Sequence, residues 1–165
     1  TGFHYDSTAF KRTSEPTNVA AHYWLQSEDL LITRSNSPDL VGHVAIYDGS
    51  PSPCIYPDLM MKLKVARQVA DTRFVWLWLQ TLTVRDYIGR HAKGTSPTMK
   101  KITQGVVMEI PFPTGIQPTE QRRIVAYLDG LQAKVDALKR LQSETAAELH
   151  AMLPAILDRA FKGEL

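Results

Sequence analysis

The segment from Ile124 to Met152 reads IVAYLDGLQAKVDALKRLQSETAAELHAM, and the spacing of its apolar residues decides the fold of the C-terminal part of the chain. Apolar residues recur at alternating steps of four and three, and Gln142 and Thr145 are the polar interruptions. Such a heptad pattern places one apolar stripe along a single long helix. The candidate interface positions on this stripe are Ile124, Leu128, Leu131, Val135, Leu138, Leu149 and Met152.

The expected helix is too long to bury this stripe within its own chain. From Glu120 to Met152 it would extend about 50 Å, at about 1.5 Å per residue. The stripe therefore predicts a partner helix from a second copy of the chain or from another protein. Pro154 lacks a backbone N–H, so we expect it to end or kink the helix, with 155–161 forming a final turn or two.

Residues 1–117 have a different character, because short apolar runs alternate with turn-forming residues. The runs 30–33, 43–47 and 60–65 predict strands. Between them lie Asn36-Ser37-Pro38-Asp39 and Asp48-Gly49-Ser50-Pro51, which are typical of turns.

Helices are predicted after these strands. Asp71 is placed to cap a helix that carries Phe74, and Thr83 is placed to cap a second short helix. Residues 106–111 predict a last strand, stopped by Pro111. We therefore expect an α+β chain, in which a small mixed domain (1–117) precedes a long coiled-coil helix with a C-terminal turn (118–165).

The composition is that of an ordinary globular chain of 165 residues, 44% hydrophobic and 22% charged. The net charge of +2 does not by itself indicate a nucleic-acid partner. Cys54 has no second cysteine with which to pair, which favours a cytoplasmic location. The apolar run 74–79 is far shorter than the roughly 20 residues that span a bilayer, so no membrane partner is expected.

Motifs for catalysis are missing from the sequence. The five histidines are scattered, without the spacing that places two metal ligands on one helical face. The glycine-rich phosphate loops, the dinucleotide-binding turn and the serine nucleophile elbow do not occur. We therefore expect no enzyme activity, no catalytic residue, no metal and no cofactor.

Positive charge is concentrated between residues 85 and 101. This stretch contains five Arg and Lys residues and one Asp, which give it a net charge of +4. Small and hydroxyl-bearing residues lie between the lysines, so the backbone and side chains can approach phosphate oxygens. The alternative is a solvated loop whose lysines bind nothing. The candidate DNA-binding residues are Arg90, Lys93, Thr95, Ser96, Lys100 and Lys101.

A second polar cluster, Arg34-Ser35-Asn36, follows the strand at 30–33. Arg and Asn are the side chains best suited to paired hydrogen bonds with guanine and adenine edges. These three residues are therefore also candidates for DNA binding, and the alternative is a plain turn.

Several motifs together resemble type I restriction-modification specificity (S) subunits. In the N-terminal part these are Glu28 to Ser37 and Leu40 to Ala45, which resemble the strand, Arg-Ser turn and Gly-centred return of a target recognition domain. In the C-terminal part the similar segments are Lys93-Gly94-Thr95 with Met99-Lys100-Lys101-Ile102, Ile110-Pro111-Phe112-Pro113, Glu120 to Asp129, and Ala160 to Leu165.

The resemblance implies a subunit that selects a DNA sequence and has no chemistry of its own. The implied partners are double-stranded DNA, a methyltransferase (modification) subunit that methylates adenine, and a restriction subunit within the complex. It further implies one target recognition domain, N-terminally incomplete relative to the family, and one spacer helix. Either the chain is a half-subunit or fragment that forms a homodimer, or the missing part leaves the DNA-binding face incomplete. The competing interpretation is a coiled-coil adaptor that does not bind DNA.

Overall fold

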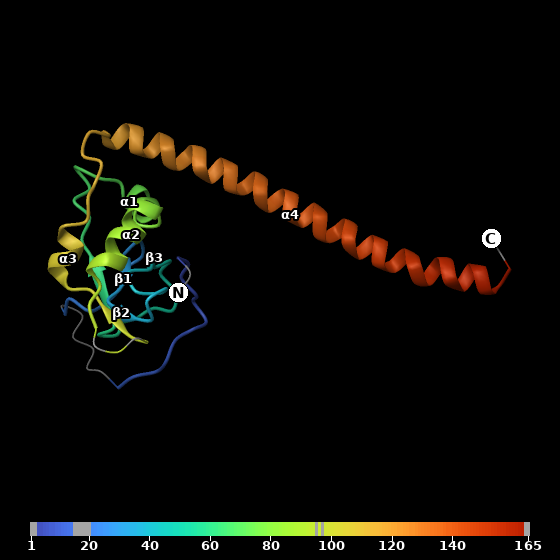
Figure 1. Ribbon diagram of the computed structural model, residues 1–165, viewed down its shortest axis with the longest axis horizontal. Coiled ribbons are helices and arrows are strands. Elements are labelled where there is room, and N and C mark those ends of the chain that lie inside the picture. The colour runs from blue at the N-terminus through green and yellow to red at the C-terminus, as the bar shows by residue number, and fades with distance from the viewer. Residues whose placement is uncertain (1–2, 15–20, 95, 97, 164–165) are drawn as a thin grey trace. The chain divides into compact units, whose positions relative to one another are not determined.

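The computed structural model describes residues 3–14, 21–94, 96 and 98–163. The chain divides into two compact units, one ending at Arg123 and the other beginning at Ile124. The described residues of the first unit form five short strands and three short helices. The long helix α4 (Pro118–Phe161) begins in the first unit and continues from Ile124 onward in the second. The fold is therefore mixed α and β with a long C-terminal helix, which confirms the predicted fold class (Figure 1).

A three-stranded antiparallel sheet forms the centre of the first unit. Its order is β3 (Val44–Ile46), β1 (Leu30–Thr33), β4 (Met60–Leu63), so that β1 lies in the middle. All four residues of β1 are buried, as expected for a central strand between two partners. The three predicted strands are thus present, and the second and third are shorter than their apolar runs suggested.

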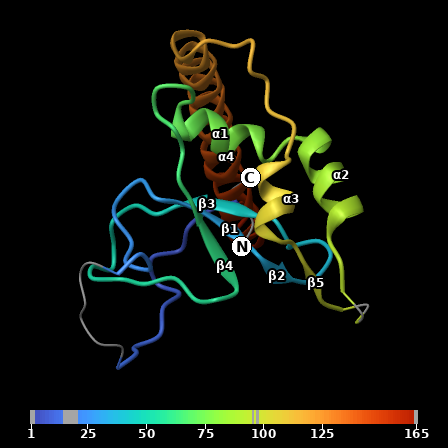
Figure 2. The same ribbon diagram turned by 90° about the vertical axis from the view of Figure 1, so that its left-hand side faces the viewer.

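Two helices pack beside this sheet (Figure 2). Helix α1 (Thr72–Trp78) begins at the predicted cap, because the carboxylate of Asp71 accepts hydrogen bonds from the backbone N–H groups of Arg73 and Phe74. Helix α2 (Leu82–His91) is capped at Thr81, two residues before the predicted cap. Buried residues of α2 join those of the central sheet in one core cluster that includes Ile32, Val84 and Ile88.

The strand predicted at 106–111 is wrong, since this region contains helix α3 (Gln104–Met108). The side-chain oxygen of Thr103 accepts a hydrogen bond of 3.3 Å from the backbone N–H of Val106, which caps the helix start. Val106 and Val107 are partly buried against the core cluster. Packing and the cap therefore outweigh the preference of valine for strands.

Helix α4 continues through Pro154 to Phe161, so the helix does not end at this proline, which was one of the two predicted outcomes, and the turns predicted at 155–161 are part of the same helix. Pro154 and its neighbours Leu153 and Ile156 are exposed, and the carbonyl that loses its intrahelical hydrogen bond can be solvated there. None of the described helices is both long enough and apolar enough to span a membrane.

Candidate nucleic-acid interface

Two clusters that are far apart in sequence become neighbours in a small second sheet. Strand β2 (Ser35–Asn36) pairs antiparallel with β5 (Lys100–Lys101), with Ser35 opposite Lys101 and Asn36 opposite Lys100. Figure 2 shows these two strands side by side at the edge of the first unit. The structure therefore joins the Arg34-Ser35-Asn36 cluster to the lysine-rich segment.

Lys93 extends this arrangement on the other side of β5. The backbone N–H of Lys93 donates to the carbonyl of Lys101 at 2.9 Å, and the N–H of Lys101 donates to the carbonyl of Lys93 at 2.8 Å. The N–H of Ile102 donates to the carbonyl of Arg34 at 2.9 Å. We call Arg34–Asn36, Lys93 and Lys100–Lys101 the basic ribbon.

The basic ribbon presents cations that the rest of the described chain does not neutralise. Arg34, Lys93 and Lys101 are exposed, and no carboxylate among the described residues forms an ion pair with them. Lys100 is half-buried, and its ammonium donates to the carbonyl of Gly94 at 3.4 Å. Such a surface attracts a polyanion, because the field of several unpaired cations adds up.

The polar side chains of β2 differ in their exposure. Ser35 is only 5% exposed, and its hydroxyl has no hydrogen-bond partner among the described residues. Asn36 is half-buried, and its side-chain oxygen accepts from the backbone N–H of Ser37 at 2.8 Å. The amide nitrogen of Asn36 remains a donor that can face outward, whereas the Ser35 hydroxyl is turned into the protein.

The remaining predicted residues lie next to the basic ribbon in sequence. Arg90 pairs with Asp86 at 3.3 Å, and both side chains are exposed, so the pair contributes little to stability. The hydroxyls of Ser96 and Thr98 lie 2.8 Å apart. Thr95 lies outside the described residues.

Arg85 contributes to the positive charge of this region of the sequence but has a structural role. Its guanidinium donates to the carbonyls of Val41 at 2.9 Å and Asp39 at 3.1 Å. These bonds hold the loop that follows Ser37, and burial lowers the pKa of Arg85. The charge counted in the sequence is therefore larger than the charge that the surface presents.

Sequence reasoning missed two features of the ribbon. The carbonyl of Leu59 accepts from the backbone N–H groups of Arg34 and Ser35, at 2.8 and 3.2 Å. A Cβ atom on Gly94 would lie 2.3 Å from the carbonyl oxygen of Met99, so glycine is required where the backbone at these two residues approaches. The glycine of the Lys93-Gly94-Thr95 motif could have indicated the close backbone approach to Met99. No local pattern in the sequence indicated the contact with Leu59.

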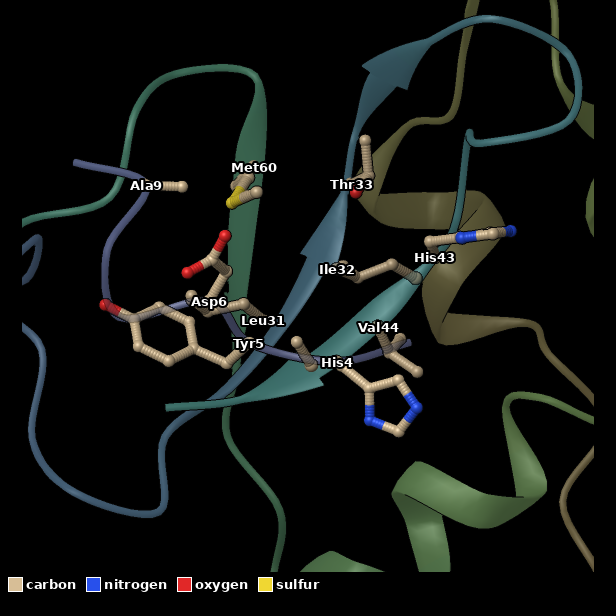
Figure 3. A pocket seen from close by; sticks show the side chains of 11 residues that line it. His4, Tyr5, Asp6, Ala9, Leu31, Ile32, Thr33, His43, Val44 and Met60 are labelled. Atoms are coloured by element: carbon tan, nitrogen blue, oxygen red, sulfur yellow. The ribbon is translucent and has the colours of Figure 1, made fainter. Parts of the chain in front are cut away.

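A cavity of about 140 Å³ lies against the three-stranded sheet (Figure 3). The Asp6 carboxylate in its lining accepts hydrogen bonds from the N–H and the hydroxyl of Thr8, at 2.9 and 2.6 Å. Burial lowers the pKa of His43, and the nearby Arg85 acts in the same direction. Among the described residues, no cluster of three metal-ligating side chains occurs here or elsewhere. The lining residues are His4, Tyr5, Asp6, Ala9, Leu31, Ile32, Thr33, His43, Val44, Ala45 and Met60.

The heptad stripe of α4 is largely exposed in the single chain. Leu128, Leu131 and Val135 are about two-fifths exposed, and the more C-terminal positions are more so. An apolar stripe of this length is costly in water, which makes α4 a candidate protein interface. The exposed stripe residues are Leu128, Leu131, Val135, Leu138, Leu149 and Met152, and Ile124 is half-buried.

Comparisons with known proteins give a consistent result, although no family model matches the sequence. The type I restriction enzyme EcoDI specificity subunit of Escherichia coli is 32% identical over 122 residues, which cover 74% of this chain and 25% of that protein. The StySPI specificity subunit of Salmonella potsdam is 26% identical over 146 residues, covering 87% and 31%.

A solved structure described as the structural basis of complex assembly and conformational transition of the type I R-M system is also similar. Its TM-score is 0.62 at 31% identity, and the match covers 88% of this chain and 33% of that chain. This chain thus spans about a quarter to a third of the length of these proteins. In sequence and in fold, it therefore corresponds to a segment of a type I restriction-modification specificity subunit.

Proposed function

We propose that this chain recognises a double-stranded DNA sequence for a type I restriction-modification complex. The observation that carries the proposal is the pairing of β2 with β5, which joins the two candidate clusters in one basic ribbon whose Arg34, Lys93 and Lys101 are exposed. Phosphates would be neutralised by Arg90, Lys93, Lys100 and Lys101, and base edges would be contacted by Arg34 and Asn36. Ser96 and Thr95 are further candidates for phosphate contacts.

The chain itself would supply no chemistry in this proposal. Adenine methylation and DNA cleavage would belong to a methyltransferase subunit and a restriction subunit bound to it in the cytoplasm. Residues 1–117 would form the target recognition domain and residues 118–165 the spacer helix. The α4 stripe would pair with the same helix of a second copy, in a homodimer.

The test is methylome sequencing of a host that carries the complete system, compared with the same host lacking this chain. We expect one methylated adenine motif to disappear when the chain is removed. Double substitution Arg34→Ala and Asn36→Ala should abolish or change the same motif, whereas Ala133→Ser with Ala147→Ser, at exposed positions of α4 away from the stripe, should leave it intact. An unchanged set of methylated motifs in the host lacking the chain would contradict the proposal and favour an adaptor that does not bind DNA.

A further inference from the structure

Met99 is an exposed apolar side chain directly beside the basic ribbon. It is 46% exposed and lies outside the hydrophobic core cluster. It immediately precedes Lys100, and Lys93 and Lys101 form an antiparallel bridge on either side of it in sequence. An apolar group at this position serves no folding role in the core, and water solvates it poorly.

The backbone holds Met99 at a defined place relative to the lysines. Its carbonyl lies against Gly94, so closely that a Cβ atom there would be only 2.3 Å away. Its N–H donates to the carbonyl of Ser96 at 3.4 Å. Two backbone hydrogen bonds join Lys93 and Lys101. These contacts place the backbone of Met99 next to Lys100, at the end of the basic ribbon.

The two-stranded sheet of β2 and β5, which Met99 directly precedes in sequence, favours one DNA groove. The major groove of B-form DNA admits a two-stranded β-ribbon, and the thymine C5-methyl group is its apolar base-edge feature. The lysines of the basic ribbon, Lys93, Lys100 and Lys101, would lie near the phosphates on either side of the groove. The long, polarisable side chain of methionine adapts well to an apolar contact whose exact position varies.

Resting on the proposed function, we propose that Met99 is a specificity-determining residue that contacts the C5-methyl group of a thymine in the major groove. Arg34 and Asn36 would select bases by hydrogen bonding, while Met99 would add selection by an apolar contact. This contact discriminates thymine from cytosine, which lacks the methyl group.

The experiment uses the full chain reconstituted with the methyltransferase subunit of its system. The target is first obtained by selection from randomised duplexes, and each of its thymines is then replaced singly by deoxyuridine, which removes only the methyl group. At one position the parent complex should bind about four-fold more weakly, as expected for losing one buried methyl-sized group. The Met99→Ala complex should bind the thymine and deoxyuridine duplexes equally.

Met108→Ala is the matched control, because Met108 is 82% exposed and belongs to α3, outside the basic ribbon. This control should keep the four-fold difference. The inference is overturned if Met99→Ala also keeps it, or if no single deoxyuridine weakens binding by the parent complex. A parent complex that selects no sequence at all would contradict the proposed function itself.

Discussion

Gln121 shows how one buried side chain can hold two backbone segments together, the residues that precede α1 and the residues that lead into α4. It is fully buried in the first turns of α4, and its carbonyl oxygen accepts from the N–H of Asp71 at 2.9 Å. Its amide nitrogen donates to the carbonyls of Val69 at 3.3 Å and Ile116 at 2.7 Å. Because Asp71 also caps α1, Gln121 joins the start of α1 to the start of α4 within the first unit.

The variant Gln121→Ala should lower the free energy of unfolding by about 2–4 kcal/mol. Each lost hydrogen bond contributes about 1 kcal/mol, and the buried groups left without partners add a further penalty. Urea unfolding followed by tryptophan fluorescence measures this loss. The exposed neighbour Gln117→Ala is the control and should change stability by less than about 0.5 kcal/mol. Equal effects of the two substitutions would contradict this role of Gln121.

The lysines of the basic ribbon are single residues whose predicted role is to attract DNA through their charge. If Lys93, Lys100 and Lys101 contact phosphates, each contact contributes about 0.9 to the slope of log affinity against log salt concentration. Alanine at all three positions should therefore flatten the slope by up to about 2.7 for any duplex sequence. Titration of the reconstituted complex with duplex DNA at several salt concentrations gives this slope.

A control variant removes the same charge elsewhere. Lys64, Lys134 and Lys139 are exposed and lie outside the basic ribbon, and their joint replacement by alanine should leave the slope close to that of the parent. The same flattening in both triple variants would show that net charge, rather than the ribbon, sets the salt dependence.

Tyr5 provides a pH dependence whose sign can be stated. Burial raises its pKa to about 12, from an ordinary value of about 10. The folded chain thus retains the phenol proton at a pH where the unfolded chain has lost it, so stability should fall as the pH rises from about 10 towards 12. Tyr5→Phe should reduce this alkaline loss in urea unfolding. Tyr47, whose pKa burial also raises, continues to contribute a loss of the same sign in this variant.

A Tyr5→Phe variant that loses as much stability as the parent over this pH interval would contradict the effect of Tyr5. Comparison at neutral pH corrects for any loss of packing, because the phenol is protonated in both states there.

At the scale of the element, apolar periodicity predicted the central sheet, α1, α2 and the long helix. It did not predict β5, since Lys100–Lys101 contains no apolar residue and is a strand only through its pairing with β2 and Lys93. Such long-range pairing is not encoded in a local pattern. The same reason explains why the sequence indicated Arg34–Asn36 and the lysines as separate clusters, while their association became visible only in the structure.

At helix α3 and at Pro154 the error was the opposite one. A local residue preference predicted the structure, and the surrounding structure outweighed that preference. Valines at 106 and 107 favour a strand, yet the cap by Thr103 and the packing on the core select a helix. Proline disfavours a helix interior, yet α4 continues through Pro154. The free-energy preference of a single residue for or against a helix or strand is smaller than the stabilisation that tertiary packing or a long helix supplies.

The exposed apolar stripe of α4 predicts that the chain self-associates. Leu131→Lys with Leu138→Lys should convert a self-associated chain into a monomer, because each substitution places a charge in an apolar interface. Multi-angle light scattering measures the mass directly. The matched control is Ala133→Lys with Ala147→Lys, two exposed positions away from the stripe that add the same charge. The same mass for the parent and the stripe variant would show that the stripe is not a self-association surface.

At the scale of the whole molecule, the two units obtain their stability in different ways. The first has a core around β1, α2 and Ile102, whereas the described side chains of the second are almost all exposed. A helix without a packed face is only marginally stable in water. The helical structure of the second unit should therefore depend on association, and the fold of the first should not.

Thermal unfolding can separate the units, because all three tryptophans, Trp24, Trp76 and Trp78, lie in the first unit. The midpoint followed by tryptophan fluorescence should stay constant when the protein is diluted ten-fold. The helical signal in far-ultraviolet circular dichroism should show a further transition whose midpoint falls on dilution, because association stabilises α4 by mass action. If both signals unfold in one transition whose midpoint does not change on dilution, the second unit does not rely on a second copy. If the tryptophan midpoint also falls on dilution, the first unit takes part in association.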